Sequence, residues 1–318
     1  MSHSLRRKPD LKNMKEDRKA QLLLTSAAVI WGTTFVVGKL SLEFFGAIYL
    51  GFLENALGGA ILLGALLAQE IGNHDNRVVS SFRNPKTLLL GLLNGIAYTL
   101  QYIGLAITEA SKAGLLVNVG VTFVPFFALF LLHDPLNRRE LGALCMAIVG
   151  ASFISTGGDL SVILQGGNFG DLMVLAAGIL WALWIVVAQA SITEMQRPLR
   201  VAAPNAIFTG VIMGIAALFA GQFTLEPLQV LTAQMYVLYL GVMSIGLAYM
   251  LYYEGLKRAG GTKSAIYLLM QALVAMILGV ALLAEELGLV ALVGAVLVLC
   301  AIGFAGSTEK TKAAKTEE

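Results

Sequence analysis

The stretch Ala28-Val-Ile-Trp31-Gly-Thr-Thr-Phe-Val-Val-Gly-Lys39 lies in a long apolar run, and it has a counterpart in the second half of the chain. In that counterpart, Gly178-Ile-Leu-Trp181-Ala, apolar residues again lead to a tryptophan. Gln189 follows Trp181 by eight residues, just as Lys39 follows Trp31. Two matching apolar runs of this length are typical of a membrane protein with an internal repeat.

Further residues recur at a fixed separation of 151 positions. The pairs are Tyr98 and Tyr249, Tyr102 and Tyr253, Gly104 and Gly255, and Asp134 and Glu285. The chain therefore consists of two related halves. Each half holds five apolar runs, an odd number, so the second half is expected to enter a membrane in the opposite sense from the first. Inverted repeats of this kind recur in secondary transporters.

The composition excludes most other classes of protein. The chain has 318 residues, of which 57% are apolar and only 13% are charged, and its mean hydropathy is +0.78. A soluble domain carries about 25% charged residues, and a disordered chain carries more. The net charge of +2 is too small to indicate a nucleic-acid partner. We interpret Cys145 and Cys300, which lie within apolar runs, as small core residues.

The apolar runs predict an all-α membrane protein with ten transmembrane helices, because a helix needs roughly 20 residues to cross a bilayer. The predicted helices cover 20–40, 44–69, 87–106, 110–132, 139–157, 169–191, 200–221, 233–256, 262–283 and 287–306. With a cytoplasmic N-terminus, all but two of the 22 Lys and Arg residues lie on the cytoplasmic side. The two exceptions are Lys39 and Lys112. The positive-inside rule therefore places both termini in the cytoplasm.

This pattern divides the chain into two five-helix repeats and three short segments. The repeats cover 20–157 and, inverted, 169–306. The short segments are a basic cytoplasmic tail (1–19), an outer loop (158–168) and a second cytoplasmic tail (307–318).

Several of these segments resemble the drug/metabolite transporter superfamily, in its ten-helix EamA type. They are the quoted stretch 28–39, Lys112-Ala-Gly-Leu, Phe123-Val-Pro125-Phe-Phe, Ala248-Tyr249 through Leu256-Lys257, and Leu283-Ala-Glu285-Glu286. The resemblance implies a central cavity lined by the first, third, fourth, sixth, eighth and ninth helices, and transport by alternating access. The chain has Glu54 where the family often has Arg, and Ala272 where it often has Pro. The second difference predicts a straighter ninth helix.

Ionisable residues within the predicted helices are expected to have a functional or structural role, since placing one at mid-bilayer costs roughly 2.5–3.5 kcal/mol of insertion free energy. Glu54 is predicted to bind a coupling proton or cation or to pair with a substrate amine; alternatively, its carboxyl group locks two helices together. Lys39 either contacts substrate or extends to the interface near Glu43. Glu254 is either a second coupling residue at a gate or part of a surface ion pair with Lys257 and Arg258.

Polar and aromatic side chains on one face of several helices predict a cavity wall, because such a stripe inside lipid must face protein or water. The alternative is that they only hold helices together. The predicted substrate-binding residues are Trp31, Lys39, Asn94, Tyr98, Gln101, Tyr102, Asn118, Trp181, Gln189, Tyr249, Tyr253, Tyr267 and Gln271.

The sequence offers no pattern for a metal site, a cofactor or a nucleotide. His3, His74 and His133 are all peripheral, and no phosphate-binding glycine loop occurs. We therefore expect no enzyme and no nucleic-acid partner, but a multi-pass secondary transporter of the cell inner membrane, as a monomer or homodimer. The resemblance favours export of amino acids, related metabolites or toxic compounds, with proton coupling or exchange. The alternatives are a membrane-embedded lipid-modifying enzyme and a non-transporting membrane subunit.

Overall fold

The computed structural model describes residues 11–71, 77–132, 138–159 and 168–301, and every regular element within these ranges is helical. Most of the two predicted tails, much of the predicted outer loop, and His74, His133 and Asp134 lie outside the described residues. The all-helical prediction is confirmed for the part of the chain that is described.

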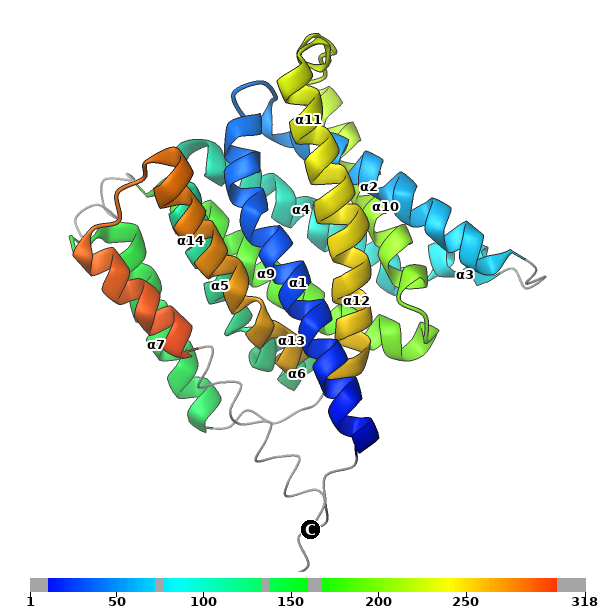
Figure 1. Ribbon diagram of the computed structural model, residues 1–318, viewed down its shortest axis with the longest axis horizontal. Coiled ribbons are helices and arrows are strands. Elements are labelled where there is room, and N and C mark those ends of the chain that lie inside the picture. Colours follow the sequence, from blue (N-terminus) through cyan, green and yellow to red (C-terminus); the bar gives the residue numbers. More distant parts are fainter. Residues whose placement is uncertain (1–10, 72–76, 133–137, 160–167, 302–318) are drawn as a thin grey trace, which may run out of the picture.

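The first half of the chain forms seven helical elements, drawn from blue to green in Figure 1. The start of one of them shows how local sequence sets a boundary. Asn84 accepts a hydrogen bond from the backbone N–H of Lys86, and Pro85 occupies the first helical position, where no N–H is needed. The elements are α1 (Leu11–Ser41), α2 (Ala47–Glu70), α3 (Arg77–Arg83), α4 (Pro85–Ile107), α5 (Ala110–Val121), α6 (Val124–Leu132) and α7 (Arg138–Thr156).

The second half contains a similar succession, which ends in a helix at Leu289–Ala301. Its third long helix is continuous but changes type, because a π-helical segment separates two α-helical ones. The elements are α9 (Phe169–Met195), α10 (Leu199–Phe219), η1 (Glu226–Gln229), α11 (Leu231–Tyr239), the π segment η2 (Leu240–Leu247), α12 (Ala248–Ala259), α13 (Gly261–Tyr267) and α14 (Leu269–Leu283).

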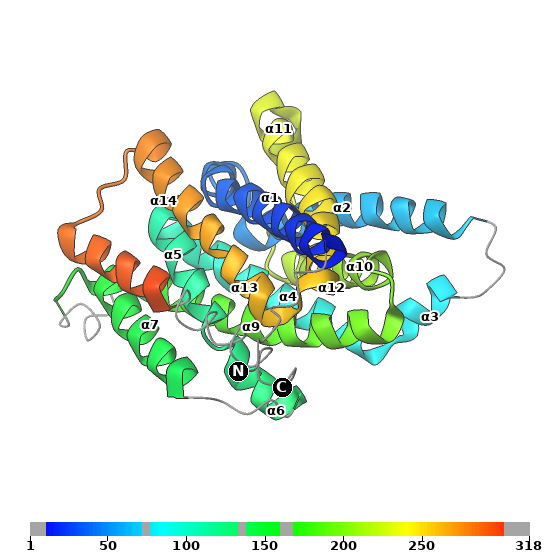
Figure 2. The ribbon, with the colours of Figure 1, turned by 60° about the horizontal axis from the view of Figure 1, so that its bottom comes forward.

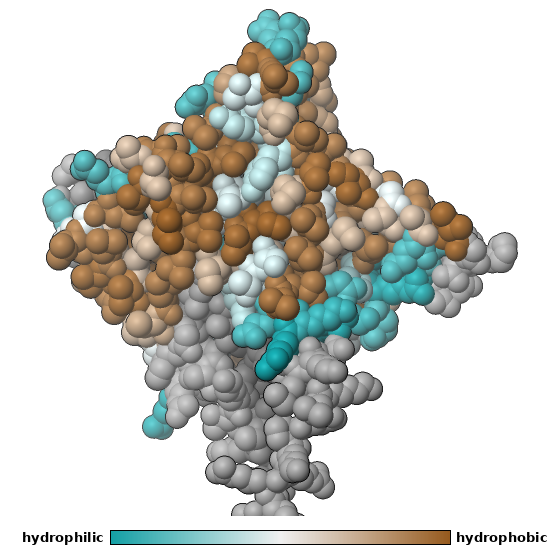
Figure 3. Space-filling model, viewed as in Figure 1, coloured by the Kyte–Doolittle hydropathy of each residue, from teal (hydrophilic) through white to brown (hydrophobic). Residues whose placement is uncertain are grey.

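Seven helices in the described ranges are long and apolar enough to span a membrane, and three shorter apolar helices occupy the remaining predicted runs. Figure 3 shows hydrophobic side chains over the middle of one face, with hydrophilic groups at its upper tip and towards its lower edge. On α4, Leu88, Leu92 and Ile96 are exposed along one side, whereas Asn94 and Tyr98 are buried on the other. The apolar side is therefore suited to lipid, and the polar side faces the protein interior.

Three details differ from the sequence predictions. Cys145 and Cys300 are exposed on the helix bundle rather than buried in its core. The ninth predicted helix is interrupted at Leu268, which separates α13 from α14, although it contains no proline. The fourth is divided at Thr122 and Phe123, just before Pro125, which has no N–H to donate to a carbonyl of the preceding helical turn.

The helix pairings follow the internal repeat. Between the halves, α2 packs against α10 and α5 packs against α14. The pairing of α4 with α9 has its counterpart in that of α1 with α12, and the pairing of α4 with α10 in that of α2 with η2. Exchanging the two halves therefore maps the first two contacts onto themselves and interchanges the members of each of the other two pairs. Figures 1 and 2 both show α1 and α14 side by side across the molecule, from segments far apart in the sequence.

Candidate functional site

A cavity of about 70 Å³ lies between the two halves. Its walls come from α1, α4, α5, α9 and α12, and from the break between α13 and α14, where Leu268 and Gln271 line it. The structure brings eight of the predicted substrate-binding residues together in this lining: Trp31, Asn94, Tyr98, Gln101, Asn118, Trp181, Tyr249 and Gln271.

Aromatic rings form much of the cavity wall and support one another. The ring of Tyr252 lies 5.0 Å from that of Trp31 and 5.9 Å from that of Trp184, with the second pair stacked. Elsewhere in the wall, Tyr98 meets Trp181 edge to face, with the ring centroids 5.5 Å apart. Such packing fixes the ring positions and leaves apolar faces towards the cavity.

The polar groups of the wall are of two kinds. Asn94 is fully engaged: its amide donates to the hydroxyls of Tyr249 at 2.8 Å and Thr209 at 3.2 Å, and its carbonyl accepts from the Trp181 indole at 2.9 Å. By contrast, Asn118 Oδ1 and the Tyr252 hydroxyl are buried and have no hydrogen-bond partner within the described protein. Buried polar atoms are usually paired, so these two are available to a solute or to water.

Glu54 lies behind this wall, on α2. It is 1% exposed, and it accepts a hydrogen bond from the Tyr102 hydroxyl. Tyr102 in turn stacks on Tyr98, a lining residue, with the ring centroids 6.0 Å apart. A change at the Glu54 carboxyl group can therefore reach the cavity through two adjacent rings.

The sequence model of one transporter family matches both halves of the chain. The EamA-like transporter family model covers residues 18–156 and 168–306, which is most of the chain. The chain belongs to the EamA-like transporter family. The resemblance to the drug/metabolite transporters is thereby confirmed, and so is the two-repeat architecture.

Similar proteins are known from archaea and bacteria. An uncharacterized transporter of Archaeoglobus fulgidus is 25% identical over 78% of this chain and 84% of its own length. The uncharacterized transporter YoaV of Bacillus subtilis is 23% identical over 89% of this chain and 95% of its own length. The uncharacterized inner membrane transporter YedA of Escherichia coli is 24% identical over 81% of each chain. One protein crystal structure shares the EamA fold with a TM-score of 0.66, at 19% identity, over 90% of this chain and 96% of that one.

Lys39 of this EamA-like protein does not line the central cavity. Its ammonium group donates to the carbonyl oxygens of Leu105 at 2.7 Å and Thr108 at 2.6 Å, and so satisfies the C-terminal end of α4. It lies in a separate recess of about 700 Å³, together with Lys112 and Glu285. Lys39 therefore holds the turn between α4 and α5 in place.

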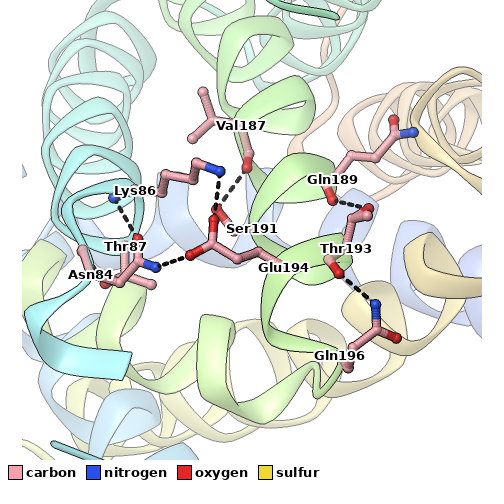
Figure 4. Close-up of polar contacts among 9 residues, drawn as sticks. All are labelled: Asn84, Lys86, Thr87, Val187, Gln189, Ser191, Thr193, Glu194 and Gln196. Carbon is pink, nitrogen blue, oxygen red and sulfur yellow. Dashed lines mark hydrogen bonds and ion pairs between the residues drawn. The ribbon is translucent and has the colours of Figure 1, made fainter. Parts of the chain in front are cut away.

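Gln189, the repeat counterpart of Lys39, has a similar role in the second half. Its side-chain oxygen accepts a hydrogen bond of 2.8 Å from the N–H of Gly261, at the turn between α12 and α13. Figure 4 shows Gln189 on α9 near a polar group in which Glu194 bridges Asn84 and Lys86. Gln189 therefore lies outside the central cavity.

Four other predicted residues also lie outside the cavity lining. Tyr102 and Tyr253 are buried behind the wall, and Tyr267 packs against the core from α13. Glu254 Oε2 lies 3.6 Å from Nη2 of Arg258, one turn along α12, and the Glu254 side chain is partly exposed. That geometry is the one expected of a surface ion pair.

Sequence reasoning missed several residues that contribute to the site. Thr34 and Tyr252 line the cavity, each three residues from a predicted lining residue on the same helix. Helical spacing could have identified both of them. Ser244 and Asn205, which contact its aromatic wall, are visible in the sequence only when the two repeats are aligned residue by residue.

Proposed function

We propose that this EamA-like protein is a secondary active transporter of small organic solutes in the cell inner membrane, working by alternating access. The observation that carries the proposal is the aromatic and amide-lined cavity at the junction of two equivalent halves. Midplane sites between repeats are the common arrangement in such transporters. The proposed topology has ten helices in two inverted repeats, 20–157 and 169–306, with both termini cytoplasmic.

The distribution of charge supports this orientation. Lys86, Arg197 and Arg200 gather near the junction of α9 and α10, where they pair with Glu194 and Glu70. Lys39 and Lys112 occupy the recess beside the turn between α4 and α5. The first group is assigned to the cytoplasmic side by the positive-inside rule, and the recess to the outer side.

The two turns held by Lys39 and Gln189 are suited to opening in alternation. Each connects the third and fourth helices of its repeat, and both of the fourth helices are broken, at Thr122 and at Leu268. Broken helices allow part of a helix to move while the rest stays packed. In this mechanism, release of one turn opens the cavity to one side of the membrane while the other turn remains held.

The cavity favours a small solute that combines apolar surface with hydrogen-bonding groups. The residues that line it carry no acidic or basic side chain, and Asn118 and Tyr252 supply the unpaired polar atoms. Amino acids, related metabolites and toxic organic compounds are the proposed classes, moved outwards. Glu54, one tyrosine behind the wall, is the proposed coupling group for protons.

A counterflow assay tests this function directly. Purified protein in liposomes, preloaded with members of a panel of amino acids and other metabolites, is expected to take up the matching radiolabelled solute. Tyr98→Ala or Tyr249→Ala should lower the initial rate about tenfold, the effect of losing a contact worth about 1.4 kcal/mol. Tyr236→Ala, which removes a tyrosine of α11 outside the cavity, is the matched control and should transport normally.

Two results would contradict the proposal. If Tyr98→Ala and Tyr249→Ala both transport at the wild-type rate, the cavity is not the solute site. If the wild-type protein gives no counterflow with any member of the panel, it is a non-transporting subunit. Mass spectrometry of the recovered solute completes the test, because a chemically altered product would favour an enzyme over a transporter.

A further inference from the structure

The close contacts of two glycines, one on α2 and one on α10, show which residues of these two helices correspond in the repeat. A side chain added at Gly59 of α2 would meet Ala206 and Ile207 of α10, and one added at Gly210 of α10 would meet Asn55 and Ala56 of α2. Adding 151 to 59, 55 and 56 gives 210, 206 and 207. The separation that relates the tyrosines therefore also relates α2 to α10, in three dimensions as well as in sequence.

At this separation, Glu54 corresponds to Asn205, and the correspondence extends to their partners. Glu54 accepts a hydrogen bond from the Tyr102 hydroxyl, whereas Asn205 donates to the Tyr253 hydroxyl at 3.2 Å. Tyr102 and Tyr253 are themselves counterparts. All four side chains are 0–1% exposed. Each repeat therefore contains one buried pairing of its second helix with a tyrosine of its third helix, but only the first repeat has an acid there.

The symmetry breaks at a second point, directly beside Glu54. Gly91 and Gly95 of α4 are four residues apart, whereas their counterparts Gly241 and Gly246 are five apart. The second half therefore contains one extra residue here, and it falls within the π segment η2. A π-helical turn accommodates an inserted residue and frequently marks a functional site.

Ser244, within this π segment, contacts both Glu54 and the cavity wall. Its side chain lies close enough to the Glu54 carboxyl group to interact with it, and its backbone carbonyl accepts a hydrogen bond of 3.1 Å from the Trp31 indole. In the second half, the counterpart of Trp31 is Trp181, which donates instead to the side chain of Asn94 in the first half. The inserted turn thus links the acid of one repeat to a lining residue of the cavity.

The chemistry of the two sites differs in one respect. A carboxylate can only accept hydrogen bonds, whereas a protonated carboxyl group both donates and accepts, as an amide always does. Asn205 already has this mixed pattern: its nitrogen donates to Tyr253, and its oxygen lies 3.5 Å from the Trp184 indole nitrogen. Asn205 therefore resembles Glu54 in its protonated form.

Building on the proposed transport function, we propose that Glu54, Tyr102 and Ser244 form the single proton-binding site of the transporter, and that Asn205 with Tyr253 is its permanently neutral counterpart. Binding of one proton to Glu54 gives the two repeats the same hydrogen-bonding pattern. Loss of that proton makes them different. The proton thereby controls whether the two halves are energetically equivalent, which is the balance on which alternating access depends.

Within the described residues, the titratable groups that interact with Glu54 do not include another acid or a base. The groups that face it are phenols: Tyr98 and Tyr102 of α4, and Tyr249 of α12. The basic residues of α4 and α10, Lys86 and Arg200, lie at the starts of those helices and pair with Glu194 and Glu70. The other ionisable residues on elements packed against α2 are Arg77 and Arg83 of α3, and Tyr236 and Tyr239 of α11, while η2 has none.

An infrared pH titration of the full-length protein in lipid nanodiscs tests the proposal, with the proton itself as the probe. The wild-type difference spectrum should contain one carbonyl band from a protonated carboxyl group that is lost as the pH rises. Glu54→Gln should abolish this band. Asn205→Asp should add a second one, and the double variant should return to a single band.

Asp171→Asn is the matched control, because Asp171 is also buried but accepts hydrogen bonds from Thr108 and Ser155, away from the cavity. It should leave the titrating band unchanged. A band that survives Glu54→Gln, or a folded Asn205→Asp protein with no added band, would overturn the proposal. Neither result bears on counterflow, which tests transport separately. Each substitution is close in size to the original residue, and size-exclusion profiles verify folding.

Discussion

Two tyrosine hydroxyls in the cavity wall, one paired and one free, separate solute binding from structural support. The Tyr249 hydroxyl accepts a hydrogen bond from Asn94, whereas the Tyr252 hydroxyl is buried without a partner in the described protein. Removing a hydroxyl that has a partner leaves a buried donor unsatisfied, which costs about 1–3 kcal/mol. Removing one that has no partner carries no such cost.

Phenylalanine substitutions at these two positions should therefore differ in their effects on stability and on solute binding. Tyr249→Phe should lower the thermal unfolding midpoint, because Asn94 loses an acceptor. Tyr252→Phe should leave the midpoint unchanged or raise it, and should weaken solute binding, because that hydroxyl is free to contact the solute. Thermal unfolding in detergent and counterflow rates measure the two effects. Equal destabilisation by both substitutions would show that Tyr252 has a structural partner after all.

Among the helical elements, the π segment η2 is the one in which the second repeat differs from the first by an inserted residue. Its extra residue lies between Gly241 and Gly246, so the residues on either side keep the register of a regular helix. Deletion of Ser244 should therefore restore an ordinary α-helix, with Tyr249 still facing the cavity. The same deletion removes the backbone carbonyl that accepts from Trp31 and the side chain that interacts with Glu54.

We expect the Ser244 deletion to insert and fold, but to lose the titrating carboxyl band or move it to a different pH. The fluorescence of Trp31 should change as well, because its indole loses its acceptor. Deletion of Met250, in the regular helix α12, is the control. It rotates the following residues by about 100° and should abolish folding. A Ser244 deletion that misfolds as completely as the Met250 deletion would contradict this account of the π segment.

The elements also show how far sequence could predict the structure. Runs such as 169–191 and 200–221 were predictable because hydrophobicity and length alone decide that they are helices. The break at Leu268 and the role of Lys39 were not, since they depend on contacts with residues distant in sequence, such as the carbonyl of Thr108. Tyr98 was predicted to face a cavity because helical spacing puts it on a polar face, and Trp181 because it lies mid-span; both line the cavity in the structure.

For the whole molecule, the proposed inversion of the repeats predicts which side of the membrane each end of the helix bundle faces. Lys112 and Lys86 are both partly exposed, and they are assigned to opposite sides of the membrane. The exposed Cys145 and Cys300 would be replaced by serine before a single cysteine is introduced, so that only that position reacts.

In intact bacterial cells, a membrane-impermeant maleimide should label Lys112→Cys but not Lys86→Cys, and disruption of the membrane should expose both. Lys86 lies beside Glu194 of the second repeat, so Glu194→Cys provides a matched control in the other half and should behave like Lys86→Cys. Labelling of Lys112→Cys and Lys86→Cys from the same side would place both turns on one face of the membrane. The two held turns could not then act as opposite gates, because alternating access needs one gate on each side of the solute.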